Sequence, residues 1–123
     1  MRKSKVETKN ILDEILEGIK KNKGKEIVVI DLNTIKHTEC GYFVICHGTS
    51  TTQVNSIALS VEETVKENTG INVWHRDGYR NSIWILLDYG DIMVHVFQKD
   101  SREFYNLEGL WADAKITRIE DEL

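Results

Sequence analysis

The residues best placed to do chemistry lie in the stretch His47-Gly48-Thr49-Ser50, between an apolar run and a predicted helix. A helix N-terminus offers free backbone N–H groups, and a glycine turn lets an anion approach them closely. However, Ser50 and Gln53 have the spacing of a capping box, in which side chains satisfy those donors. The stretch also lacks the Lys of a P-loop. We therefore favour a capped helix and keep nucleotide binding through Gly48-Thr49-Ser50 as the alternative.

The positions of the carboxylates are a further test of nucleotide binding, because in nucleotidyltransferases a glycine-serine turn also precedes a helix. Those enzymes need two carboxylates two residues apart on the next strand, where both side chains face the same way and hold metal ions. The next expected strand, residues 71–75, has no carboxylate. Asp88 and Asp91 are three residues apart around a turn, and Asp31 stands alone. We therefore predict no catalytic residues.

Histidines offer no better metal site. His37, His47, His75 and His95 include no pair at i and i+2 on a strand or at i and i+4 on a helix. Those spacings would bring two ligands onto one face. The sequence thus predicts neither a metal nor a cofactor.

Apolar periodicity defines the elements that must position these residues. Helical spacing predicts a helix from about residue 5 to 22, and a second from Thr51 to about residue 69. A last short helix is expected to be capped within residues 100–103, with Phe104, Leu107, Leu110 and Trp111 as its apolar side. The expected strands are 26–32, 42–47, 71–75, 82–88 and 91–97. This order predicts an α/β (α+β) fold, a mixed five-stranded sheet packed with helices.

The chain has 123 residues, which suits a single domain spanning 1–123. The core is expected at about 5–114, followed by an acidic tail at 115–123. The net charge is −4, yet residues 1–25 hold eight Lys or Arg against four acids. An acidic body disfavours DNA or extended RNA binding and suits a basic protein partner. No apolar run is long enough to span a membrane, and we expect a cytoplasmic protein.

Aromatic residues near the C-terminal half form a second pattern. Strand alternation places Trp84, Leu86 and Asp88 on one face, and Met93, His95 and Phe97 on one face of the next strand. Tyr105, Glu108 and Trp111, three residues apart, would extend this patch along the last helix. An unroofed face of this kind favours protein contacts, although each aromatic residue by itself is more often core.

Three long segments carry a family resemblance. They are Tyr42 to Ser50 with Gln53-Val54, Trp84 to Phe97, and Arg102 to Ala114. With these segments the sequence resembles the Iojap family, also called ribosomal silencing factor RsfS, over about residues 5–114. The resemblance implies a factor that is not an enzyme, with a nucleotidyltransferase-like fold that lacks the catalytic carboxylates.

The resemblance also implies partners. Members of this family tend to form homodimers and bind the large-subunit ribosomal protein numbered fourteen. They thereby block subunit joining and repress translation when nutrients are short, and roles in ribosome biogenesis are attributed to them. The basic first helix is a candidate for a minor contact with ribosomal RNA. The expected partner-binding residues are Trp84, Asp88, Tyr89, His95, Arg102, Tyr105, Glu108 and Trp111.

Overall fold

Two long helices form one layer of the computed structural model, which describes residues 4–35, 38 and 40–120. Helix α1 spans Lys5–Lys21 and helix α2 spans Thr51–Thr69. Both begin at a serine cap: the backbone N–H of Glu7 donates to Ser4 Oγ, and that of Gln53 to Ser50 Oγ. Gly70, with φ of +75°, ends α2 in the left-handed conformation that glycine adopts readily. Both predicted helices are confirmed.

The strands form one mixed sheet. They are β1 (Lys25–Asp31), β2 (Tyr42–Gly48), β3 (His75–Asp77), β4 (Trp84–Asp88), β5 (Ile92–Gln98) and β6 (Lys115–Arg118). Their order across the sheet is β3-β4-β5-β2-β1-β6, and only the β2–β5 pair is parallel. Strands β1 and β2 pair antiparallel as neighbours in the chain, as do β4 and β5. The mixed α+β architecture is therefore confirmed.

The sheet has six strands, whereas the sequence predicted five. The additional strand, β6, pairs antiparallel with β1 at the edge of the sheet. It lies in the segment expected to be an acidic tail. Its four residues, Lys-Ile-Thr-Arg, bury little, so their pairing depends on the backbone groups that β1 offers at its free edge. A strand held mainly by a neighbour's backbone leaves little hydrophobic pattern in its own sequence.

The segment 71–75 was predicted as a strand and is mostly a connection. Only His75 belongs to β3, which continues to Asp77. Ile71 and Val73 are half-buried against the core under the helices, which explains the apolar alternation of this segment. Trp74, by contrast, is 70% exposed. Alternation here reflects a connection that lies across the core rather than a longer strand.

The last helix is broken into two. Helix α3 covers Lys99–Tyr105 and α4 covers Leu107–Leu110, separated by Asn106 with φ of +45°. Gln98 caps α3 by accepting from the backbone N–H of Asp100, so the cap lies before the predicted 100–103. The break turns α4, and the predicted apolar side is wrong in part. Leu107 and Trp111 pack inward, whereas Phe104 and Leu110 are exposed.

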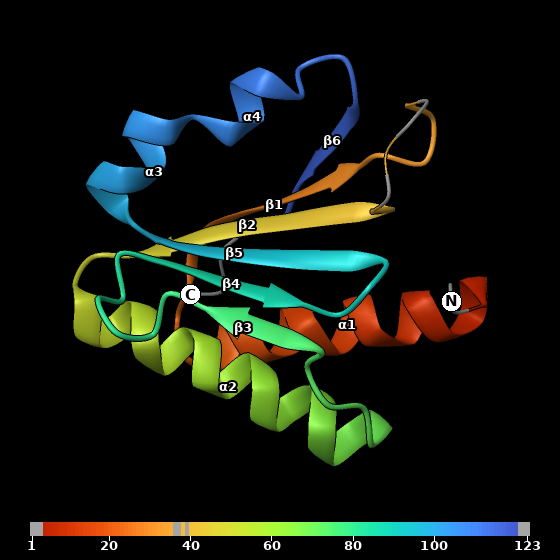
Figure 1. Cartoon of the computed structure of the whole chain (residues 1–123), viewed down its shortest axis with the longest axis horizontal. Coiled ribbons are helices and arrows are strands. Elements are labelled where there is room, and N and C mark those ends of the chain that lie inside the picture. The colour runs from red at the N-terminus through yellow and green to blue at the C-terminus, as the bar shows by residue number, and fades with distance from the viewer. Residues whose placement is uncertain (1–3, 36–37, 39, 121–123) are drawn as a thin grey trace.

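The two faces of the sheet are covered differently (Figure 1). Helices α1 and α2 cover what we call the inner face, over the larger core. The opposite face, the outer face, is covered by α3 and α4 only at the end where β2 and β5 finish. A smaller core lies there, around Ile45 and Phe97. The outer face therefore has an uncovered part beside a pair of short helices.

Gly18 sets the distance between α1 and α2, which leads to a stability prediction. A Cβ at this position would lie 2.7 Å from the Cα of Val61, closer than real Cβ contacts. Replacing a glycine in the middle of a helix by alanine ordinarily stabilises the helix by about 1 kcal/mol. Here we expect Gly18→Ala to lower the free energy of unfolding by about 1–3 kcal/mol, because α2 must move away. Urea denaturation measures it.

The matched control for this substitution is Glu17→Ala, at the exposed neighbouring position. It should change the free energy of unfolding by less than about 0.5 kcal/mol. A Gly18→Ala variant as stable as the parent chain would show that the two helices are not held at this distance.

Candidate partner-binding surface

The turn before α2 is a completed cap. The backbone N–H of Gln53 donates to Ser50 Oγ (3.1 Å), and that of Thr49 donates to Gln53 Oε1 (2.8 Å). Gln53 Nε2 also reaches the carbonyl oxygen of Lys23 (3.3 Å). A Cβ at Gly48 would lie 3.1 Å from the backbone N of Val54, so glycine lets the strand approach the helix. Two donors that a phosphate would use here are thus bonded within the chain, as the capping interpretation predicted.

The carboxylates and histidines stay dispersed. Within residues 4–35, 38 and 40–120, no three side chains of the His, Cys, Asp or Glu type are grouped to hold a metal. Asp31 accepts from the backbone N–H of Asn33, and Asp88 accepts from that of Gly90, both in local turns. His37 lies outside the described residues. These acids stabilise turns where the chain leaves its strands.

Strand register arranges the outer face in three rows across β2, β5 and β4. The covered row is His47, Phe97 and Trp84; the middle row is Ile45, His95 and Leu86; the open row is Phe43, Met93 and Asp88. The first two residues of the covered row are buried, whereas every member of the open row is half-buried. Apolar surface therefore increases toward the part of the sheet that no helix covers in Figure 1.

Trp84 is the centre of an aromatic cluster that joins this face to α3. Its ring stacks on Phe97, with centroids 4.8 Å apart, and lies 4.8 Å from Tyr105. Tyr105 in turn meets Phe104 edge to face at 5.1 Å. On the other side, Phe43 contacts His95 at 4.7 Å and Trp111 at 5.9 Å. The cluster runs from the buried Phe97 to the 80% exposed Phe104.

His95 is held neutral inside this cluster. Trp84 Nε1 can only donate, and it donates to His95 Nδ1 at 3.1 Å, which places the imidazole proton on Nε2. Burial lowers the pKa of His95 to about 4, since a charged imidazole would lose its hydration. His95 Nε2 is itself buried, and among the described residues it has no hydrogen-bond partner. The ring thus positions Trp84 from beneath the surface.

Arg102 joins the two short helices to the sheet. Its Nε and Nη2 donate to Glu108 Oε1 (3.0 and 2.6 Å), which bonds α3 to α4. Its Nη1 reaches the carbonyl oxygen of Lys25 (3.3 Å) and His47 Nδ1 (3.0 Å). Because arginine only donates, His47 accepts at Nδ1 and carries its proton on Nε2, which faces Glu26 at 3.6 Å. This network fixes α3 and α4 over the sheet.

The predicted partner-binding residues separate by exposure. Tyr105 is exposed, and Trp84, Asp88, Glu108 and Trp111 are half-buried. His95 and Arg102 are only 5% and 7% exposed, so the expectation that they lie on the surface is wrong. They support the surface from beneath instead. Tyr89 is 2% exposed and packs into the core of the inner face, on the other side of the sheet.

Several surface residues were not in the predicted set. Phe104 and Leu110 are 80% and 74% exposed on α3 and α4, and Phe43, Leu86 and Met93 are half-buried on the sheet. A continuous helix would have turned Phe104 and Leu110 inward. Asn106 was the available signal against it, because Asn tolerates the left-handed conformation that ends a helix. We call the exposed or half-buried side chains of this face the aromatic surface. It comprises Phe43, Trp84, Leu86, Met93, Phe104, Tyr105, Leu110 and Trp111.

Acidic groups border the aromatic surface. Asp100, Glu103 and Asp113 are exposed on or beside α3 and α4, and Asp88 is half-buried at the open row. An apolar patch with a charged border is the usual arrangement of a protein interface. None of the helices in the described part of the chain has the length and apolar character needed to cross a membrane.

Comparison with known proteins gives consistent matches. A family model described as ribosomal silencing factor during starvation (RsfS) matches residues 5–123. The ribosomal silencing factor RsfS of Bacillus subtilis is 38% identical over 112 residues, 91% of this chain and 93% of that protein. The chloroplastic protein Iojap of Zea mays is 36% identical over 73 residues, 59% of this chain and 31% of that protein. A crystal structure from Chromobacterium violaceum aligns with a TM-score of 0.79 at 30% identity, covering 85% of each chain.

Proposed function

This chain belongs to the family of ribosomal silencing factors, and on that premise we propose that it binds the large ribosomal subunit and prevents the small subunit from joining. The family is one of silencing factors and not of enzymes. The proposed contact is the large-subunit protein numbered fourteen. Blocking needs no chemical step, only a contact whose free energy competes with subunit joining, and the result is repression of translation.

The aromatic surface is the observation that carries this proposal. Its Trp84 is held rigidly by stacking on Phe97, whereas Phe104 protrudes into solvent. Large aromatic side chains often contribute most of the binding energy of a protein interface. Its acidic border suits a basic partner, and ribosomal proteins must neutralise RNA phosphates. The predicted set is therefore proposed in two roles. Trp84, Asp88, Tyr105, Glu108 and Trp111 contact the partner, while His95 and Arg102 hold them.

Further properties of the family are proposed for this chain in the same way. We propose a single domain of residues 1–123, cytoplasmic, that forms a homodimer and takes part in ribosome biogenesis. Its fold is proposed to be nucleotidyltransferase-like without the catalytic carboxylates. The basic N-terminal helix is proposed to make a minor contact with ribosomal RNA.

Sedimentation of purified ribosomal subunits tests the proposal. We expect the protein to travel with the large subunit and to reduce the amount of joined ribosomes. If it stayed at the top of the gradient and joining were unchanged, the silencing function would fail for this chain.

Exposed residues give the cleanest test of which surface binds. The double variant Phe104→Ser/Leu110→Ser should weaken binding to the large subunit at least about tenfold, because truncating an interface anchor commonly costs more than about 1 kcal/mol. Both side chains are exposed, so folding should be little affected. The matched control is Leu59→Ser, at a 47% exposed position of α2 on the inner-face side. Equal losses in both variants would count against the aromatic surface.

A further inference from the structure

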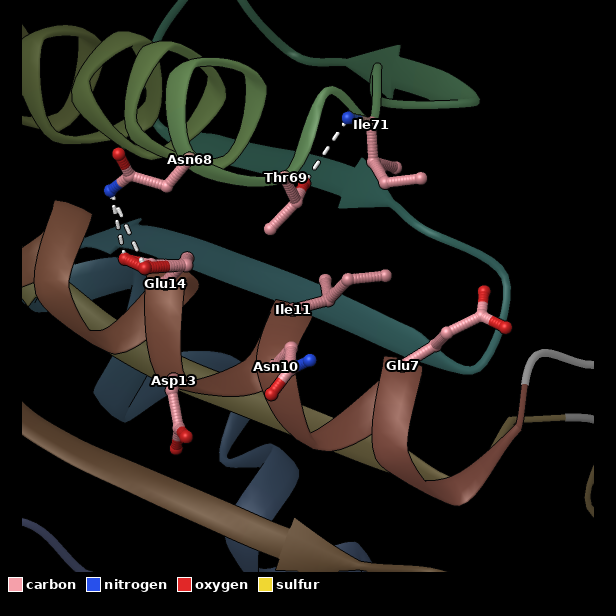
Figure 2. A pocket seen from close by; sticks show the side chains of 8 residues that line it. All are labelled: Glu7, Asn10, Ile11, Asp13, Glu14, Asn68, Thr69 and Ile71. Atoms are coloured by element: carbon pink, nitrogen blue, oxygen red, sulfur yellow. Dashed lines mark hydrogen bonds between the residues drawn. The ribbon is translucent and has the colours of Figure 1, made fainter.

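A groove opens between the N-terminal half of α1 and the end of α2 (Figure 2). Because these helices cover the inner face, the groove lies on the other side of the sheet from α3 and α4 (Figure 1). Its volume is about 410 Å³. It is lined by Glu7, Asn10, Ile11, Asp13, Glu14, Asn68, Thr69 and Ile71. We call it the interhelical groove.

Unequal helix pairing produces this groove. Hydrogen bonds join the antiparallel helices along their length, among them Asn22 with Ser56, Gly18 with Ser60, Lys21 with Thr64, and Glu14 with Asn68. Beyond Asn68, α2 stops at Gly70 and the chain turns away, while α1 continues to Lys5. The first turns of α1 therefore have no helix beside them, and on the groove side the segment at Ile71 lies near. A hollow remains with side chains of α1 along one wall (Figure 2).

The lining has two chemical parts. Ile11, 2% exposed, and the half-buried Ile71 make an apolar floor. The borders hold three carboxylates, Glu7, Asp13 and Glu14, and among the residues that the structure describes no Lys or Arg lines the groove. Asp13 already faces Lys9 at 3.3 Å, so the negative charge rests mainly on the other two.

Amide groups complete the borders. Asn68 donates through Nδ2 to Glu14 (2.9 Å), and among the described residues no donor bonds its side-chain oxygen Oδ1. Asn10 lies opposite on α1, where Figure 2 shows its side chain beside Ile11. Side-chain amides of this kind can bond the backbone of an extended peptide.

From the charge and the floor together we propose that the interhelical groove binds a Lys- or Arg-bearing peptide segment of a protein partner. One basic side chain lies against Glu7 and Glu14, and a neighbouring apolar side chain covers the half-buried Ile71. The groove and the aromatic surface lie on opposite faces of the sheet. The chain can therefore hold two partners, or two parts of one partner, at the same time.

Nuclear magnetic resonance of the ¹⁵N-labelled chain tests this proposal with two peptides. One is Arg-Ile-Arg, acetylated at its N-terminus and amidated at its C-terminus, and the other is its neutral analogue Gln-Ile-Gln. The basic peptide should shift the backbone resonances of residues 7–14 and 68–71 and leave those of 84–111 unchanged. The double variant Glu7→Gln/Glu14→Gln keeps the oxygen acceptors for Ser4 and Asn68 and should weaken this binding at least fivefold. Glu63→Gln, an exposed acid of α2 outside the groove, should leave it unchanged.

The other outcomes overturn the proposal. Equal shifts with the neutral peptide, unweakened binding by the double variant, shifts elsewhere, or none at all would each exclude a site for basic segments. Because no ribosome is present in this experiment, its failure leaves the proposed silencing function untouched.

Discussion

Replacing Arg102 by Met should lower the free energy of unfolding by about 3 kcal/mol. Methionine has a similar length but no donors, so Glu108, His47 Nδ1 and the carbonyl of Lys25 lose their partner together. Removing one member of a buried ion pair typically costs about 3–5 kcal/mol, because the remaining charge stays buried. The Glu108 side chain is 21% exposed, so we expect the lower end of that range. Urea denaturation at neutral pH measures the loss.

A second substitution separates a stranded charge from lost packing. In the variant Arg102→Met/Glu108→Leu the carboxylate is gone as well, and stability should recover by more than about 1 kcal/mol relative to Arg102→Met. The surface control is Lys99→Met, at an exposed position in the same helix. If the double variant were no more stable than the single one, the pair would not account for the loss.

Arg102 also links stability to binding. It contacts α4, β1 and β2 but lies beneath the surface, so its removal should loosen α3 and α4 while the sheet remains folded. Tyr105 and Trp111 would then lose their fixed positions relative to Trp84. We expect Arg102→Met to weaken large-subunit binding although Arg102 itself is 7% exposed. Binding would then be lost although every side chain proposed to contact the partner is still present.

The elements that the sequence predicted well are those with local causes. Short local segments fix three helix ends: Ser4 begins α1, Ser50 begins α2, and Gly70 ends α2. Strand β6 has no such cause. Its four residues pair because β1 presents an unpaired edge, and that edge is known only once the whole sheet is assembled. The sixth strand therefore could not be read from residues 115–118 alone.

The candidate site divides in the same way. Strand alternation placed Trp84 and Leu86 on one face of their strand, and His95 and Phe97 on one face of the next. The pairing of Trp84 with Phe97 and of Leu86 with His95 shows that these are the same face of the sheet. Strand alternation cannot predict which part of a sheet face the helices will cover. His95 and Arg102 are buried because α3 and α4 turn back over the sheet at Asn106, so their exposure depends on a single backbone conformation. Tyr89 was misplaced because the residue after a strand can turn to either face.

Acidification should destabilise the chain through His95. Its pKa is lowered to about 4 by burial, whereas an exposed histidine in the unfolded chain titrates near 6.5. Between these values the unfolded state binds the proton and the folded state does not, so stability falls as pH falls. The contribution is intact above about pH 6.5 and is lost progressively toward pH 4. The difference between the two pKa values corresponds to about 3 kcal/mol.

A variant without the titrating ring isolates this contribution from that of the carboxylates. Gln at position 95 can still accept from Trp84 Nε1 but does not titrate, so His95→Gln should lose less stability than the parent chain between pH 7 and pH 4.5. The matched control, His75→Gln, replaces an exposed histidine of β3 and should follow the parent. Parallel stability curves for His95→Gln and the parent chain would mean that protonation of His95 does not oppose folding. A smaller loss of stability in His95→Gln than in the parent chain would show that the aromatic surface depends on a neutral imidazole beneath Trp84.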